Sequence, residues 1–267
     1  MVQTQAATLA PPTRRERRRQ DRLERAHLGS TRRSASRTPA WRSPIVLVSG
    51  IAVVAGLALI LALGQRQAPT PGALNVPPTS YDPGLVSGET LGRADAPVTL
   101  EIWSDFQCPF CGQLARTYLP QLVSEFVVAG QVRIVPRDVD FVGRGVPNES
   151  VEAAVGASCA ADQGKYWQYH DILLWNQAGE NEGAFSEARL RQMADQVGLD
   201  RGRWDECRSD PDRAAGVALT TSEALAAGIT GTPTLVLNGV ATSGMPRTYA
   251  ELADAVRAVL AATPTPP

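Results

Sequence analysis

Residues 103–111 read WSDFQCPFC, and this stretch decides how the rest of the chain is interpreted. Before it, apolar and polar side chains alternate, which predicts a strand over about 97–103. After it, apolar residues recur every four positions from Leu114 to Phe126, which predicts a helix that ends at Gly130. The two cysteines of this stretch therefore lie where a strand passes into a helix.

Two cysteines separated by two residues form either a redox pair or half of a zinc site. A structural zinc site takes four ligands, which usually come from two such pairs. The other cysteines, Cys159 and Cys207, stand 48 residues apart, and the whole chain holds only two histidines. The pattern therefore favours a redox pair, and we expect neither a metal nor a bound cofactor.

The position of the pair at a helix start suggests its chemistry. Backbone N–H groups at a helix N-terminus stabilise an anion, so a thiolate is favoured there. We expect Cys108 to be the exposed nucleophile, with a lowered thiol pKa. Cys111, one turn further, is expected to lie beneath it and to resolve the mixed disulfide. Pro109 sets a helical φ without an N–H, and Phe110 adds no charge beside the thiolate.

Further elements follow from the same kind of pattern. A second strand is predicted at 131–138, and residues 150–228 show helical signatures only. A hairpin is predicted at 234–241 because Asn-Gly is a strong two-residue turn signal. Thr248 and Glu251 form a capping box for a last helix. Strand–helix–strand, a helical block, a hairpin and a helix are the order of a thioredoxin-type fold with a helical insertion.

Three motifs in this order resemble the DsbA-like thiol:disulfide oxidoreductases: WSDFQCPFC at 103–111, GKYWQYHD at 164–171 and GTPT at 231–234. The resemblance covers about 85–262 and implies an α/β, thioredoxin-like fold with an all-helical insertion at about 143–230. It also implies that the two cysteines of the first motif, Cys108 and Cys111, are catalytic.

The resemblance further implies that Thr232-Pro233 is a cis peptide beside the cysteines. Its outward backbone edge would pair with an extended substrate and hold the substrate's cysteine over Cys108. On this view four residues support the active site: Pro109, Phe110, Thr232 and Pro233.

The sequence departs from that family at one position. Members commonly carry a buried acid six residues before the first cysteine, and Ile102 stands there in this chain. Glu101 is one residue away, and a shift of one residue on a strand faces the opposite side. The proton acceptor therefore stays open between a bulged Glu101, Asp105 and water.

Cys159 and Cys207 are expected to form a structural disulfide inside the helical block. An export compartment is oxidising, and an even number of cysteines is expected there. In the chain-entropy description, a disulfide that closes a loop of about 50 residues adds roughly 4 kcal/mol to the free energy of unfolding. An alternative stays open, in which this pair passes electrons to Cys108 and Cys111.

The net charge of −1 hides two opposite regions. Residues 1–43 hold eleven arginines against three acids, whereas the rest of the chain holds fifteen basic and twenty-four acidic side chains. Because the excess positive charge is confined to a tail, we expect no nucleic-acid partner.

Residues 45–64 lack any charged side chain, and twenty residues of helix span about 30 Å, the thickness of the hydrocarbon core.

We therefore predict a disordered cytoplasmic tail at 1–43, a single transmembrane helix at 44–64 and a catalytic domain outside the cytoplasm. A cleaved signal peptide that ends near Gly64 is the alternative. Residues 65–84 contain five prolines and are predicted to be an extended linker. Residues 263–267 are predicted to be a disordered tail.

These observations predict a membrane-tethered, extracytoplasmic thiol:disulfide oxidoreductase that forms disulfides in exported proteins through Cys108 and Cys111. Its expected partners are exported proteins with cysteines and a membrane redox partner, and we expect a monomer. A reductase or isomerase of the same fold is an alternative, which Thr232 favours because isomerases of the family often carry threonine there. A peptide-binding chaperone with an inactive cysteine pair is the other alternative.

Overall fold

The computed structural model describes residues 72–143, 148–242 and 244–263, together with Arg14, Arg15, Arg18, Arg22 and Leu23. The described residues from 72 onward belong to one compact unit. No helix in the described part of the chain is both long and apolar enough to cross a bilayer. The predicted transmembrane helix at 44–64 lies outside the described residues, as do most of the predicted tail 1–43 and residues 264–267.

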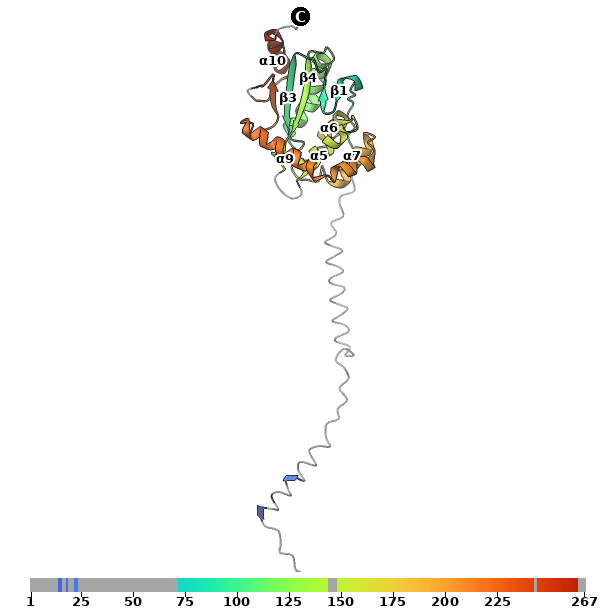
Figure 1. Cartoon of the computed structure of the whole chain (residues 1–267), viewed down its shortest axis with the longest axis vertical. Coiled ribbons are helices and arrows are strands. Elements are labelled where there is room, and N and C mark those ends of the chain that lie inside the picture. The colour runs from blue at the N-terminus through green and yellow to red at the C-terminus, as the bar shows by residue number, and fades with distance from the viewer. Residues whose placement is uncertain are drawn as a thin grey trace, which may run out of the picture. The chain divides into compact units, whose positions relative to one another are not determined.

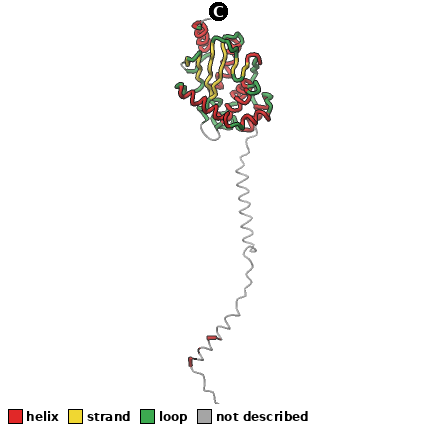
Figure 2. The backbone as a smooth tube through the Cα atoms, viewed as in Figure 1, coloured by secondary structure: helices red, strands yellow, loops and turns green. Residues whose placement is uncertain are grey.

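A sheet lies at the centre of this unit (Figures 1 and 2). It has six strands in the order β1-β2-β4-β3-β5-β6. The two central strands, β3 (Val98–Ser104) and β4 (Val132–Asp138), run parallel and stay in register along their whole length. All the other pairings are antiparallel. Both central strands were predicted, and their bounds agree to within one residue.

The helical stretch after β3 is continuous but not uniform. It consists of α3 (Pro109–Gln113), a π-type turn η3 (Leu114–Tyr118), α4 (Leu119–Leu122) and a second π-type turn η4 (Val123–Val127). Pro120 lies inside this stretch and has no N–H for the carbonyl four residues earlier. The helix has a wider, π-type turn next to this proline, in which Leu119 N donates to Leu114 O, five residues earlier. The predicted apolar face, Leu114, Tyr118, Leu122 and Phe126, is buried against the sheet.

Between β4 and β5, the described residues form five helices: α5 (Glu149–Ala161), α6 (Tyr166–Trp175), α7 (Glu187–Gln196), α8 (Arg201–Arg208) and α9 (Pro211–Ala226). They gather at the end of the sheet where β3 and β4 finish (Figure 1). Large aromatic side chains, completely buried, fill the space between them: Tyr166, Trp167, Tyr169 and Trp204. The predicted helical insertion is therefore confirmed.

The C-terminal part agrees with the sequence in its local details. β5 (Thr234–Leu237) and β6 (Val240–Ala241) form the predicted hairpin. Asn238 and Gly239 at its turn have φ of 46° and 84°, the conformation that such turns require. α10 (Tyr249–Ala262) begins at Thr248, whose hydroxyl accepts a hydrogen bond from Glu251 N at 3.2 Å. In Figure 1, α10 lies at the end of the sheet opposite the insertion.

Residues 72–82, which fall within the predicted extended linker 65–84 and which we call the N-terminal strap, have no helix or strand but contact the folded unit. The strap lies against α6: Asn75 N donates to Asn176 Oδ1 at 2.9 Å, and Tyr81 OH donates to Asp171 Oδ2 at 2.6 Å. The hydroxyl of Thr79 also donates to the Asp171 carboxylate. Asp171 is buried, and a buried carboxylate needs donors. These donors are about 90 positions earlier in the chain, which no local pattern reveals.

A short hairpin that the sequence did not predict follows the strap. A 3₁₀ turn, η2 (Pro83–Leu85), leads into β1 (Val86–Ser87) and β2 (Thr90–Leu91). β2 pairs with β4 through Leu91 and Ile134, so this hairpin extends the sheet on the side away from β5. Strands of two residues are too short to show the alternation on which strand prediction depends.

Candidate active site

Cys108 occupies the N-cap position of α3, directly after the turn that follows β3. Its backbone is extended, and its carbonyl accepts the first helical hydrogen bond, from Gly112 N at 3.2 Å. Pro109 occupies the first helical position, where a missing N–H has no cost. Cys111 follows one turn later, and both thiols are free. The predicted placement of the pair at the helix start is confirmed.

Asp105 organises the turn that carries Cys108. Its carboxylate accepts hydrogen bonds from Gln107 N at 2.8 Å, Ser150 Oγ at 2.6 Å and Val142 N at 2.8 Å. The first is local and shapes the turn, whereas the other two come from α5 and from the loop after β4. Burial raises the pKa of Asp105, and these three donors act in the opposite direction. Asp105 therefore joins the active-site turn to the insertion.

Both thiols are buried, with 5 % of Cys108 and 1 % of Cys111 exposed. The expectation that Cys108 is exposed is thus wrong for this dithiol state. Thr232 lies over its sulfur, and Cys108 Sγ donates to Thr232 O at 3.2 Å. The exposed surface beside the sulfur comes from the two residues between the cysteines: Phe110 is 59 % exposed, and Pro109 is also exposed.

The two thiols differ in acidity. A hydrogen bond from the Cys111 thiol lowers the pKa of Cys108 to about 6, against the opposing effect of burial. The Thr232 side chain and the N–H groups of Cys111 and Phe110 make smaller contributions to this lowered value. Burial raises the pKa of Cys111 well above its usual value, and so do its hydrogen bond to Cys108 and the charge there. The surroundings thus favour the thiolate form at Cys108 and the protonated form at Cys111.

Thr232 and Pro233 reach the cysteines from 124 residues further along the chain. The peptide bond between them is cis, as the resemblance implies. β5 begins at the next residue and pairs with the end of β3 through Trp103 and Thr234. Since β3 leads directly into the cysteine turn, this register places the residue before the proline beside Cys108.

Glu101 does not serve as the acid beneath the cysteines. β3 has no bulge, so Ile102 points into the core that contains both cysteines and Glu101 faces the other side of the sheet. The Glu101 carboxylate lies 3.6 Å from the guanidinium of Arg137. The Ser104 side chain donates to Cys111 instead and lowers its pKa, against the larger effect of burial. Sequence reasoning missed Ser104, although its position at the strand end places it next to the turn.

Two further residues that the sequence did not indicate come from the loop between α6 and α7. Gln177 Nε2 donates to Phe106 O at 2.7 Å and to Cys108 O at 2.9 Å. Asn181 N donates to Gln107 Oε1 at 2.5 Å. They lie about 70 positions from their partners and belong to no recognisable motif. No sequence signal could have identified them.

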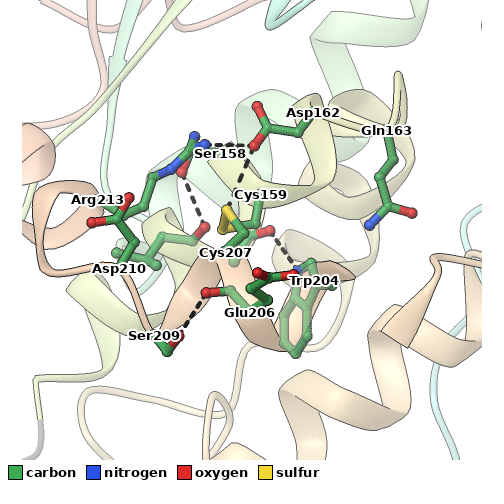
Figure 3. Close-up of a disulfide and its surroundings, with 12 residues drawn as sticks. Ser158, Cys159, Asp162, Gln163, Trp204, Glu206, Cys207, Ser209, Asp210 and Arg213 are labelled. Carbon is green, nitrogen blue, oxygen red and sulfur yellow. Dashed lines mark hydrogen bonds and ion pairs between the residues drawn. A yellow bond between two sulfur atoms is a disulfide. The ribbon is translucent and has the colours of Figure 1, made fainter. Parts of the chain in front are cut away.

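Cys159 on α5 and Cys207 on α8 form a disulfide, with their Cα atoms 5.8 Å apart (Figure 3). Cys159 is 1 % exposed. Beside it, Trp204 Nε1 donates to Gly156 O at 2.9 Å, which is a second link between the same two helices. The bond thus fixes the packing of the insertion, which is the structural arrangement that the sequence predicts.

Comparisons with known proteins agree with this architecture. A family model described as thioredoxin matches residues 86–258. Among solved structures, oxidised BdbD from Bacillus subtilis superposes with a TM-score of 0.59 at 22 % identity, covering 66 % of this chain and 96 % of that one. At this identity the likeness concerns the fold.

Two of the curated relatives that match by sequence show how much of each protein is shared. The first is Na(+)/H(+) antiporter NhaA 1 of Salinispora arenicola, 33 % identical over 153 residues, which are 55 % of this chain and 21 % of that protein. The second is probable disulfide bond formation protein D of Bacillus cereus, 31 % identical over 103 residues, which are 38 % of this chain and 46 % of that protein. The chain therefore spans between a fifth and a half of the length of these relatives.

The family match covers both the cysteine turn and the loop of Thr232 and Pro233, together with the whole helical insertion between them. The geometry of the site agrees with it, since a thiol pair at a helix start faces a cis-proline loop. The chain belongs to the thioredoxin family and carries a helical insertion between β4 and β5.

Proposed function

We propose that this protein is a thiol:disulfide oxidoreductase that forms disulfides in exported proteins. The observation that carries the proposal is the arrangement of two free thiols one helical turn apart, with Cys108 at the N-cap of α3 beside the cis Thr232-Pro233 peptide. These surroundings lower the pKa of Cys108 to about 6 and raise that of Cys111. A thiol that ionises easily is a good leaving group as well as a good nucleophile. The name of the Bacillus cereus relative, probable disulfide bond formation protein D, supports the same activity.

The reaction starts from the disulfide form of Cys108 and Cys111. A thiolate of the client attacks Cys108 Sγ, the bond between the two enzyme sulfurs breaks, and Cys111 leaves and takes up a proton. A second client thiolate then attacks the client sulfur of the mixed disulfide, and Cys108 leaves as a thiolate. The client loses two electrons and the enzyme gains them. The low pKa of Cys108 favours this second departure.

The surroundings of Cys108 suggest how a client is held. The backbone of Thr232 lies beside the sulfur, and an extended peptide that pairs with this edge would bring its own cysteine to Cys108. Phe110, which lies between the two cysteines in the sequence, offers an exposed aromatic ring suited to an apolar side chain of the client. The proposed substrate is therefore an unfolded or extended segment rather than a folded surface.

The proposal includes a tether and a source of oxidising power. The arginine-rich residues 1–43 and the apolar run that follows support an anchor at 44–64, with the catalytic domain outside the cytoplasm. Regeneration of the disulfide takes two electrons from the enzyme, which we assign to a membrane redox partner. Protease added to intact spheroplasts should remove the catalytic domain and spare the tail, whereas protection of the domain would contradict this location.

The second candidate is a reductase or isomerase of the same fold, which the resemblance supports because isomerases of that family often carry threonine at the position of Thr232. A hydroxyl beside the sulfur changes the stability of the thiolate, so the direction of electron flow depends on the potential of the pair. Equilibration of the pair with glutathione measures this potential. A value near −120 mV supports the oxidase, whereas a value near −270 mV supports the reductase.

The direct test mixes the oxidised protein with a reduced, unfolded client that carries two cysteines. We expect client disulfides to form in proportion to the enzyme consumed, and we expect the Cys108→Ser variant to form none. The Cys159→Ala/Cys207→Ala variant is the matched control and should retain the activity. Client disulfides that still form with Cys108→Ser would contradict the assignment of Cys108, whereas wild-type protein that binds the client but forms no disulfides would favour a chaperone with an inactive cysteine pair.

A further inference from the structure

Gln177 reaches the active-site turn from the helical insertion. Its Nε2 donates to Phe106 O at 2.7 Å and to Cys108 O at 2.9 Å. A side-chain amide nitrogen carries two hydrogens, so both are used here. The Gln177 side chain thus binds the backbone carbonyls of the two residues on either side of Gln107.

These two carbonyls control how the turn enters α3. Cys108 O also accepts the first hydrogen bond of the helix, from Gly112 N at 3.2 Å. A donor outside the helix that holds the same oxygen fixes the orientation of the peptide group at the helix start. The N–H groups of Phe110 and Cys111 then keep pointing at Cys108 Sγ, and they are among the groups that favour its thiolate.

Gly112 gives independent support, because Gln177 lies directly against it. A Cβ at Gly112 would stand 2.1 Å from Gln177 Oε1 and 2.6 Å from Arg116 Nη1. Glycine weakens a helix relative to alanine, so its presence in α3 has a local cost. The close approach of the Gln177 side chain gives a reason for a glycine at this position, because only a residue without a Cβ leaves room for that side chain.

The loop that carries Gln177 is anchored on both sides. Asn176, which is buried, donates to Ile172 O at 2.8 Å and to Asn75 O at 2.9 Å, and it accepts from Asn75 N. On the other side, Asn181 N donates to Gln107 Oε1. The strap and the active-site turn therefore hold the loop between them, and Gln177 can impose one geometry on its partners.

We propose that Gln177 is a positioning residue for thiol exchange at Cys108, acting through the carbonyls of Phe106 and Cys108 to keep the start of α3 directed at the sulfur. The inference rests on the proposed function, because it assigns a role in that reaction. Gln177 contacts neither sulfur in the hydrogen-bond pattern, so its effect is on the geometry of the groups that do.

The test measures the pH profile of Cys108 alkylation by iodoacetamide in the full chain after mild reduction, with the modified residue located by mass spectrometry. Gln177→Leu removes the donor at similar volume. Gly112→Ala keeps Gln177 but displaces its side chain. The matched control is Gln121→Leu, because Gln121 Nε2 also donates to a backbone carbonyl of the same helical stretch, Thr117 O at 2.6 Å.

We expect Gln177→Leu and Gly112→Ala each to raise the midpoint pH by about one, so that alkylation at pH 6 slows about fivefold. Gln121→Leu should leave the midpoint unchanged. A wild-type midpoint in folded Gln177→Leu overturns the inference, and so does an equal rise in Gln121→Leu, which would indicate general loosening of the helix. If Gln177→Leu does not fold, Gly112→Ala decides the question in the same way.

The proposed function is checked separately in the wild-type chain. A wild-type midpoint near the ~8.5 of an ordinary thiol would overturn both the function and the inference. If the wild-type midpoint is low and none of the variants changes it, the proposed function stands but Gln177 has no role in positioning the site.

Discussion

The two cysteine pairs of this chain have opposite surroundings, although Cys108, Cys111 and Cys159 are all buried. Cys108 and Cys111 stand within one helical turn, where backbone N–H groups, the Thr232 side chain and the mutual hydrogen bond favour a thiolate. Cys159 and Cys207 join two different helices, α5 and α8, and are bonded to each other. The first pair exchanges electrons in the proposed function, and the second holds the insertion together.

The comparison shows that burial alone does not make a cysteine inert. Cys108 is 5 % exposed and Cys159 is 1 % exposed, a small difference. The larger difference is the presence of donors that stabilise an anion at Cys108. Reactivity therefore follows from the groups around a sulfur rather than from the fraction of it that faces solvent.

The largest expected effect separates the two cysteines of the reactive pair. Cys111→Ala should accumulate a covalent complex with a thiol client, because no thiol remains to resolve the mixed disulfide. Cys108→Ala should trap no complex, because Cys111 is buried and keeps its proton. Non-reducing gel electrophoresis with mass spectrometry measures the complex. Equal trapping by both variants would contradict the assignment of Cys108 as the nucleophile.

The second expected effect is the pH dependence of the reduced pair. The pKa of Cys108 is lowered to about 6, below the ~8.5 of a thiol in the unfolded chain. The thiolate therefore stabilises the reduced fold most at pH above ~8.5, and this contribution falls away as the pH drops towards 6. Alkylation of Cys108 should be half-maximal near pH 6. A midpoint near that of a free thiol would remove the contrast between the two pairs.

The third prediction concerns the disulfide between α5 and α8. Because it lies in the insertion and Cys159 is buried, a weak reductant should release two thiols per chain rather than four. The Cys159→Ala/Cys207→Ala variant should lose about 2–4 kcal/mol of unfolding free energy in urea titrations. Its Cys108 alkylation profile should match that of the wild type. Release of all four thiols at one potential would favour an electron-passing role.

The fourth prediction addresses the link between the reactive turn and the insertion. Asp105→Ala leaves Gln107 N, Val142 N and Ser150 Oγ without their acceptor, which should cost roughly 2–3 kcal/mol of unfolding free energy. Asp95→Ala is the control, since Asp95 is exposed and pairs only with Arg93. If the two variants unfold at the same urea concentration, Asp105 does not join the two regions.

The smallest expected effect is that of Thr232→Val. The Thr232 side chain lowers the pKa of Cys108, so the valine variant should hold its thiolate less well. Reduction then becomes less favourable, and the potential should become more negative by roughly 30 mV, equivalent to about 1.4 kcal/mol. Equilibration with glutathione detects such a shift. A shift in the positive direction would contradict the role of the hydroxyl.

Features that depend on neighbours in sequence were predictable. The cysteine pair at the start of α3, the Asn-Gly turn between β5 and β6 and the Thr248 cap of α10 all appear where the sequence places them. Each is decided by interactions among residues at most four positions apart. Such residues meet in any conformation of the chain that forms the element, so the sequence by itself determines them.

The tertiary structure alone decided which distant groups complete the site. Gln177 and Ser150 hold the cysteine turn, and the strap meets Asp171. A glutamine or a serine can satisfy a hydrogen bond almost anywhere, so its identity carries no information about its partner. The partner is set by how β3, β5 and the insertion pack together. The sequence thus determined the reactive thiols, and packing determined the groups that tune them.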